Sequence, residues 1–155
     1  MFIGPCIAKK VEAREHRETI NYVLSFEEIM CMLEGKDIKF AEMSGDAAYE
    51  RDASKLGLSF PLTAGVSAAV QDTVAAMGGE VHNAQYCSGL DKCRDTVQAA
   101  AAGKLDCSYI EGMACSNGCI DGPAAVGDFH ITKVALTKYA AAAPNKQAAE
   151  DKHTK

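Results

Sequence analysis

The chain carries two cysteine loops, Gly4-Pro5-Cys6-Ile7-Ala8-Lys9-Lys10-Val11-Glu12 and Glu111-Gly112-Met113-Ala114-Cys115-Ser116-Asn117-Gly118-Cys119-Ile120-Asp121-Gly122. Each loop follows a short apolar run of the kind that forms strands, at residues 1–3 and 107–110. Open α/β folds bind ligands at the carboxyl ends of strands, where such loops begin. Thiolates are soft ligands that suit zinc and iron–sulfur clusters. The sequence therefore predicts an α/β fold with a thiol-rich site at its strand ends.

The two loops differ in how strongly each one alone indicates a metal. An isolated Cys6 is more often a small buried hydrophobe than a ligand. Cys115 and Cys119 form a Cys-x3-Cys pair, which favours metal or redox chemistry about as strongly as a structural role. Gly118 can adopt the left-handed conformation that would turn both sulfurs to one side. No second close pair of Cys or His is present, so the spacing does not favour a complete zinc finger.

Taken together and in this order, the loops resemble the second and third cysteine loops of the iron-only (di-iron) hydrogenase large subunit. The first loop matches that family at Pro5, Cys6, Lys9 and Glu12, and the second at Met113, Ala114, Cys115, Gly118 and Cys119. Three stretches between the loops are also similar to family segments: residues 21–29, 60–66 and 89–94. The resemblance covers residues 2–143.

This resemblance implies a three-layer α/β fold, a sheet flanked by helices, with residues 1–144 as the carboxy-terminal lobe of the catalytic domain and 145–155 as a polar tail. It implies that Cys6 and Cys115 hold a four-iron (4Fe-4S) cubane and that Cys119 bridges the cubane to a di-iron centre. Lys9 would lie against an anionic cyanide ligand of that centre, and Met113 would pack near the iron. The parent protein would then interconvert dihydrogen with protons and electrons.

The chain also departs from the family pattern. Only three of the family's four cluster cysteines have counterparts, because the first cysteine loop, which also carries the catalytic proton-relay cysteine, has none. Gly4 stands where Met is usual and Pro123 interrupts a glycine-rich run, as in divergent, sensor-type members. We therefore expect little or no cluster in this chain by itself. A non-catalytic iron–sulfur assembly or interaction protein of the same fold, a hydrogen sensor, and a plain α/β module with unmetallated cysteines remain alternatives.

The composition of the chain disfavours several classes of binding partner. The chain has 155 residues, enough for one domain, with 16 basic and 21 acidic residues and a net charge of −5. Without a basic stripe, nucleic acid and anionic membranes are disfavoured. No apolar run approaches the about 18 residues of a membrane span. Seven cysteines without a signal peptide indicate reduced thiols in the cytoplasm. The expected partners are the upstream half of the same polypeptide, an electron-transfer protein, and a second copy bound through the exposed cluster face.

Strands and helices are expected to alternate, which favours a parallel or mixed sheet. Ser25 and Glu28 predict a capping box that starts a helix ending before Gly35. The other expected elements are strands at 22–24, 38–40, 80–87 and 105–110; helices at 63–77, 91–102 (capped by Asp91) and 131–143; and a loop at 43–60 with a helical turn at 46–55. The remaining cysteines, at positions 31, 87, 93 and 107, are interpreted as thiols outside the site. The histidines at 16, 82, 130 and 153 are assigned to no metal.

Overall fold

The structure is a computed structural model that describes residues 1–44 and 53–145. The chain divides into two compact units, Met1–Glu50 with Asp121–Asp128 and Arg51–Ile120 with Phe129–Lys155. Each unit is built on one βαβ crossover and is considered by itself. None of the described helices is long and apolar enough to cross a membrane.

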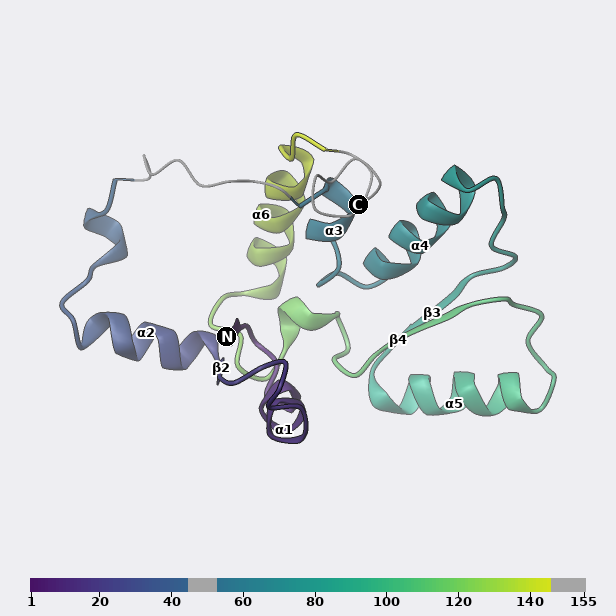
Figure 1. Cartoon of the computed structure of the whole chain (residues 1–155), viewed down its shortest axis with the longest axis horizontal. Coiled ribbons are helices and arrows are strands. Elements are labelled where there is room, and N and C mark those ends of the chain that lie inside the picture. Colours follow the sequence, from purple (N-terminus) through teal and green to yellow (C-terminus); the bar gives the residue numbers. More distant parts are fainter. Residues whose placement is uncertain (45–52, 146–155) are drawn as a thin grey trace. The chain divides into compact units, whose positions relative to one another are not determined.

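The first unit begins with a parallel two-stranded sheet (Figure 1). Strand β1 (Phe2–Ile3) pairs with β2 (Val23–Leu24), and helix α1 (Ala8–Glu15) makes the crossover that a parallel pair requires. Helix α2 (Phe26–Glu34) follows directly. Its N-cap has the predicted capping box, in which the Ser25 side chain accepts from the Glu28 N–H and the Glu28 side chain accepts from the Ser25 N–H. A single 3-10 turn, η1 (Phe40–Glu42), ends the described part of this segment.

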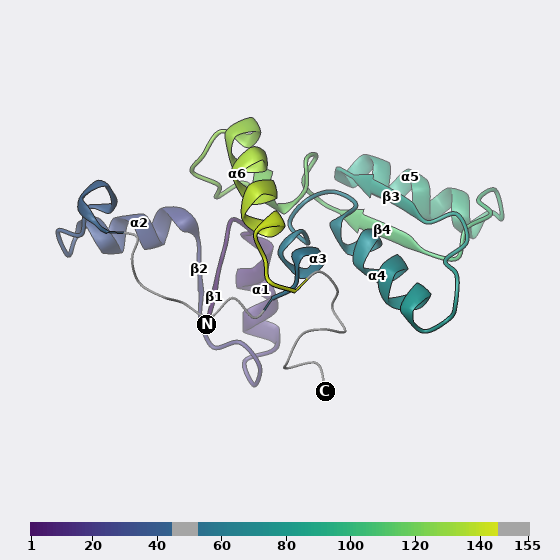
Figure 2. The same ribbon diagram turned by 90° about the horizontal axis from the view of Figure 1, so that it is seen from above.

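The second unit contains a three-layer arrangement. Strands β3 (Gln85–Ser88) and β4 (Ile110–Met113) pair in parallel, and α5 (Leu90–Ala101) connects them. Helix α5 covers one face of this sheet and α4 (Gly65–Ala76) covers the other (Figures 1 and 2). Successive residues of β4 face opposite sides of the sheet. The Glu111 side chain accepts from the backbone of α4, whereas Gly112 lies under Cys93 of α5. The predicted α/β class is confirmed.

Two further helices belong to the second unit. The short α3 (Lys55–Leu58) is capped by the Ser54 hydroxyl and packs against α6 (Phe129–Ala141). The Lys55 N–H also donates to the Asn145 carbonyl, 2.8 Å away, which ties the start of α3 to the segment after α6. The 3-10 turn η2 (Cys119–Asp121) closes the second cysteine loop.

Several expectations are corrected. Helix α1 lies where only a loop was expected, and its N-cap residue Ile7 provides no side-chain hydrogen bond that could have signalled it. The strand expected at 38–40 is absent, since Phe40 begins η1. Strand β4 lies later than the range 105–110 and runs into the motif itself. The N-cap of α5 is Gly89, with φ of 93°, rather than Asp91.

The predicted single sheet is, in the described residues, two separate two-stranded sheets. The single lobe expected over residues 1–144 stays a prediction. The helical turn expected at 46–55, the tail at 145–155 and His153 fall largely or wholly outside the described residues.

Candidate metal centre

The first cysteine loop leaves β1 and turns directly into α1. Gly4 donates its N–H to the Leu24 carbonyl at 3.0 Å, which extends the pairing of β1 and β2 to the edge of the loop. The Pro5 carbonyl accepts from the Ala124 N–H at 3.2 Å. Cys6 is half-buried, one residue before the α1 N-cap. The thiol is therefore held at the carboxyl end of a strand, as the sequence predicted, but inside the first unit.

The second cysteine loop leaves β4 in the other unit and is closed by a tight turn. The Gly118 N–H donates to the Cys115 carbonyl at 3.2 Å, and Gly118 has φ of 86°, the left-handed conformation expected for it. Cys115 is half-buried and Cys119 is exposed. This half of the predicted ligand set is thus brought together on a single turn.

Gly118 has a second reason to lack a side chain. A Cβ atom there would lie 2.6 Å from the Pro61 carbonyl oxygen and 2.9 Å from the Thr63 nitrogen. Leu62 forms an isolated antiparallel bridge with Gly118, and the Ile120 N–H donates to the Pro61 carbonyl at 3.3 Å. The cysteine loop therefore packs backbone against backbone on the turn that precedes α4.

Glu111 fixes the same turn from β4, and the sequence analysis missed it. Its side chain is only 5% exposed and accepts from the backbone N–H groups of Ala64 at 2.9 Å and Ser67 at 2.6 Å. These donors belong to the first turn of α4, where backbone N–H groups lack helical partners and a negative charge is stabilising. Ala64 has φ of 65°, a left-handed conformation that this anchor helps to hold. The sequence feature that could have revealed Glu111 is the presence of an acidic residue within the largely apolar stretch that forms β4.

The two residues expected to contact the cofactor lie in different surroundings. Lys9 is on α1, where its ammonium forms an ion pair with Glu12 one turn later. Met113 ends β4 with only 8% of its surface exposed, and its carbonyl accepts from the Gly89 N–H at 2.9 Å. Met113 is therefore a core residue of the second unit, two residues before Cys115.

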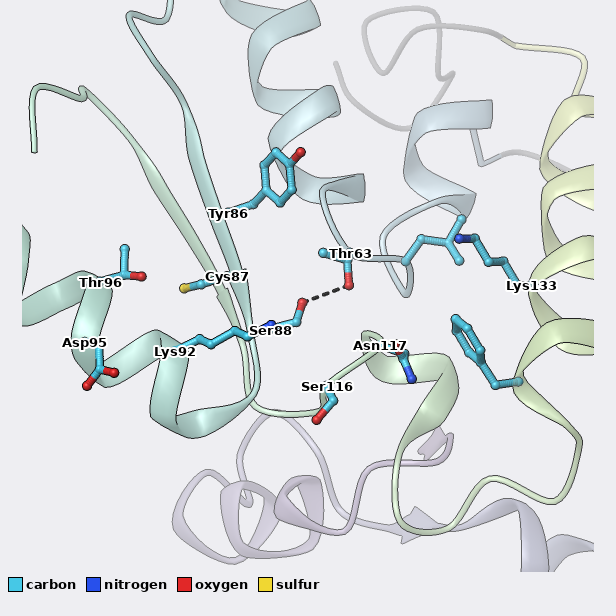
Figure 3. A pocket seen from close by; sticks show the side chains of 12 residues that line it. Thr63, Tyr86, Cys87, Ser88, Lys92, Asp95, Thr96, Ser116, Asn117 and Lys133 are labelled. Carbon is cyan, nitrogen blue, oxygen red and sulfur yellow. Dashed lines mark hydrogen bonds between the residues drawn. The ribbon is translucent and has the colours of Figure 1, made fainter.

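A cavity of about 650 Å³ opens in the second unit at the carboxyl ends of β3 and β4. Figure 3 shows that Ser88 and Thr63 meet at its centre, with their hydroxyl oxygens 2.8 Å apart. Lys92 and Asp95 of α5 lie on one side, and Lys133 lies on the other, 5.8 Å from the centre of the Phe129 ring. Ser116 and Asn117 of the cysteine turn complete the lining. The cavity has a mixed polar and apolar lining and adjoins the turn that carries Cys115.

The family of this chain is established by comparison with known protein families. Residues 1–123 match the family described as "Iron only hydrogenase large subunit, C-terminal domain". The chain belongs to this family. The matched range includes all three cysteines that the sequence analysis selected.

The iron-only hydrogenase fold is also found by comparison with solved structures. One chain, from a structure titled "[FeFe]-hydrogenase Oxygen Inactivation is Initiated by the Modification and Degradation of the H cluster 2Fe Subcluster", is similar with a TM-score of 0.61 at 14% identity. The match covers 97% of this chain and 54% of that one, so this chain spans about half of its length. A search of curated proteins found no match.

The donor set of this hydrogenase-family chain fits an iron–sulfur cluster in kind, because Cys115 and Cys119 present two thiols on one turn. It does not fit in number within either unit, since Cys6 belongs to one unit and the other two cysteines to the second. Among residues 1–44 and 53–145, no three Cys, His, Asp or Glu side chains are grouped so that they could hold a metal ion. That Cys6 shares a cluster with the other two cysteines stays a prediction.

Proposed function

We propose that this chain is the carboxy-terminal part of the catalytic domain of an iron-only hydrogenase-like protein. The parent protein would bind a four-iron cubane linked to a di-iron centre, and would interconvert dihydrogen with protons and electrons. The observation that carries the proposal is the position of the cysteines. All three lie within the family match, and both loops leave the carboxyl end of a parallel strand.

The proposed ligand roles follow the loops. Cys6 and Cys115 would hold the cubane and Cys119 would bridge it to the di-iron centre, which supplies the chemistry of dihydrogen cleavage when bound. The chain's own residues would provide a dry, fixed wall. Met113 is buried beside the cysteine turn. Glu111 bonds to the segment before α4, and the Gly118 backbone packs the cysteine turn against that segment. Lys9 would exchange Glu12 for an anionic ligand, which a long side chain at the start of a helix can do by rotation alone.

The fourth thiolate would come from the upstream half of the same polypeptide, so the isolated chain would bind a cluster weakly and would not turn over dihydrogen. Metal affinity depends on how much of the site exists before binding, and the thiols of the proposed site would come from two units. The proposed setting is cytoplasmic, with an electron-transfer protein as the redox partner.

Anaerobic reconstitution with ferrous iron and sulfide tests the proposal. We expect the chain purified in air to contain little iron, and the chain joined to its upstream segment to take up four iron and four sulfide ions per cubane. The C115S/C119S variant of the joined protein should lose this uptake. The control C31S removes an exposed thiol of α2 and should leave the uptake unchanged. Equal iron in the C115S/C119S and unsubstituted proteins would contradict the assignment.

A non-catalytic iron–sulfur protein of the same fold is the second candidate. The departures at Gly4, two residues before Cys6, and at Pro123, four residues after Cys119, motivate it, because they resemble divergent, sensor-type members of the family. Hydrogen-dependent reduction of a viologen dye by the reconstituted, joined protein separates the two. Cluster uptake without dye reduction would support the second candidate over the first.

A further inference from the structure

Two cysteines outside the proposed cluster site lie side by side in the second unit. Cys87 is in β3 and Cys93 is in the first turn of α5, and their Sγ atoms are 3.5 Å apart. Cys87 is 7% exposed and Cys93 is half-buried. From the sequence alone, both are interpreted as thiols outside the site; they lie six positions apart, with no metal-ligand spacing between them.

The two sulfurs contact each other and backbone carbonyls of the sheet. The Cys87 S–H donates to the Glu111 carbonyl at 3.4 Å, and the Cys93 S–H donates to the Met113 carbonyl at the same distance. Gly112 lies between these carbonyls, and a Cβ atom there would come within 3.5 Å of one sulfur and 3.9 Å of the other. A Cβ atom at this position would be in ordinary van der Waals contact with both sulfurs, so Gly112 is the strand residue beneath the pair.

We propose that Cys87 and Cys93 are a reversible oxidation site that closes to a disulfide. A disulfide bond is about 2.05 Å long, so the sulfurs need to approach by only about 1.5 Å, within the reach of small side-chain rotations. Both S–H bonds break, one S–S bond forms, and two protons and two electrons pass to the oxidant. The oxidant class is a two-electron thiol reagent such as hydrogen peroxide, which is reduced to water.

The cavity in Figure 3 gives the oxidant a route. Cys87 lines it, and its sulfur points toward α5, where Cys93 lies. Burial, with the neighbouring Cys87 thiol as a smaller cause, raises the pKa of Cys93, so this residue is held as a neutral thiol that keeps its S–H on the Met113 carbonyl.

Formation of the disulfide would affect the cysteine turn through the backbone at the end of β4. The disulfide would join the end of β3 to the first turn of α5, and it would remove the S–H donor from the Met113 carbonyl. That carbonyl belongs to the last residue of β4, two positions before Cys115. Oxidation of the pair would thus act on the strand end that presents the second cysteine loop.

The test uses the whole chain, fully reduced and then exposed to diamide, an azo compound that becomes a hydrazine when it takes up the two electrons and two protons. Remaining thiols are alkylated under denaturing conditions before trypsin digestion. Trypsin cuts after Lys92, between the two cysteines, so the disulfide appears as a Cys87 peptide linked to Cys93-Arg94. We expect this linked peptide, two hydrogens lighter than its separate thiol parts, to be the dominant product and to disappear on reduction.

Two cysteine variants serve as controls for the identity of the linked peptide. C107S should retain the linked peptide, whereas C93A should lose it completely. Because the decisive measurement is made on the unsubstituted chain, a C93A variant that fails to fold does not remove the test. Alkylation of both Cys87 and Cys93 after diamide treatment would overturn the proposal, as would a dominant link from either residue to Cys115 or Cys119.

Discussion

Replacing Glu111 by Gln should destabilise the second unit, although the two side chains have nearly the same size. The buried carboxylate of Glu111 accepts two backbone N–H groups from the start of α4, at 2.9 Å and 2.6 Å. A Gln side chain keeps one acceptor oxygen but turns an NH2 group toward the other N–H. Hydrogen bonds that involve a charged group contribute about 1.5–3 kcal/mol, and a donor left buried without a partner is costly. We expect the free energy of unfolding to fall by about 2 kcal/mol.

The assay is thermal unfolding followed by circular dichroism in reducing buffer. For a chain of this size, each kcal/mol shifts the midpoint by about 2–4 °C, so E111Q should melt about 4–8 °C lower than the unsubstituted chain. Amide hydrogen exchange should accelerate at Ala64 and Ser67 in particular. The matched control is E80Q, the same chemical change at an exposed position, which should stay within about 0.5 kcal/mol. If E111Q melts with E80Q, the Glu111 anchor does not hold α4.

The pKa of Glu28 is lowered by the hydrogen bond from Lys10 and then by the bond from the Ser25 N–H. Its stabilising effect is therefore present above the ordinary carboxyl pKa and is lost as the pH falls through the lowered one, so urea titrations of E28Q and the unsubstituted chain should diverge at pH 6–7 and converge once the pH is below the lowered pKa. G118A should cost roughly 1–3 kcal/mol, because a Cβ would crowd the Pro61 carbonyl at a left-handed position; equal urea midpoints would refute this. We also expect self-association through the first unit beside Cys6, since β1 has an unpaired edge in the described residues and Ile3 and Ile7 are exposed. Sedimentation velocity under reducing conditions checks this, and a monomer at all concentrations would contradict it.

The sequence predicted local features that depend on neighbouring residues alone. The α2 capping box needs only Ser25 and Glu28 three positions apart, and the left-handed turn at Gly118 needs only a glycine between two cysteines. Features that depend on distant contacts were missed. Helix α1 has no capping side chain, and Glu111 acquires its role only when β4 lies beside the start of α4. The proximity of Cys87 and Cys93 likewise requires α5 to fold back along β3.

The second cysteine turn is fixed by protein contacts that do not involve a metal. Three of them converge on the segment before α4: the Gly118 backbone lies against Pro61 and Thr63, the Ile120 N–H bonds to Pro61, and Glu111 bonds to Ala64. That segment is itself held close to α4, since a Cβ at Gly65 would collide with the Ser59 carbonyl. A site that exists before the metal arrives loses less ordering entropy on binding. The Cys115–Cys119 half of the proposed ligand set is therefore prepared within its own unit, and the affinity of the whole site depends on how Cys6 and an external thiolate are brought to it.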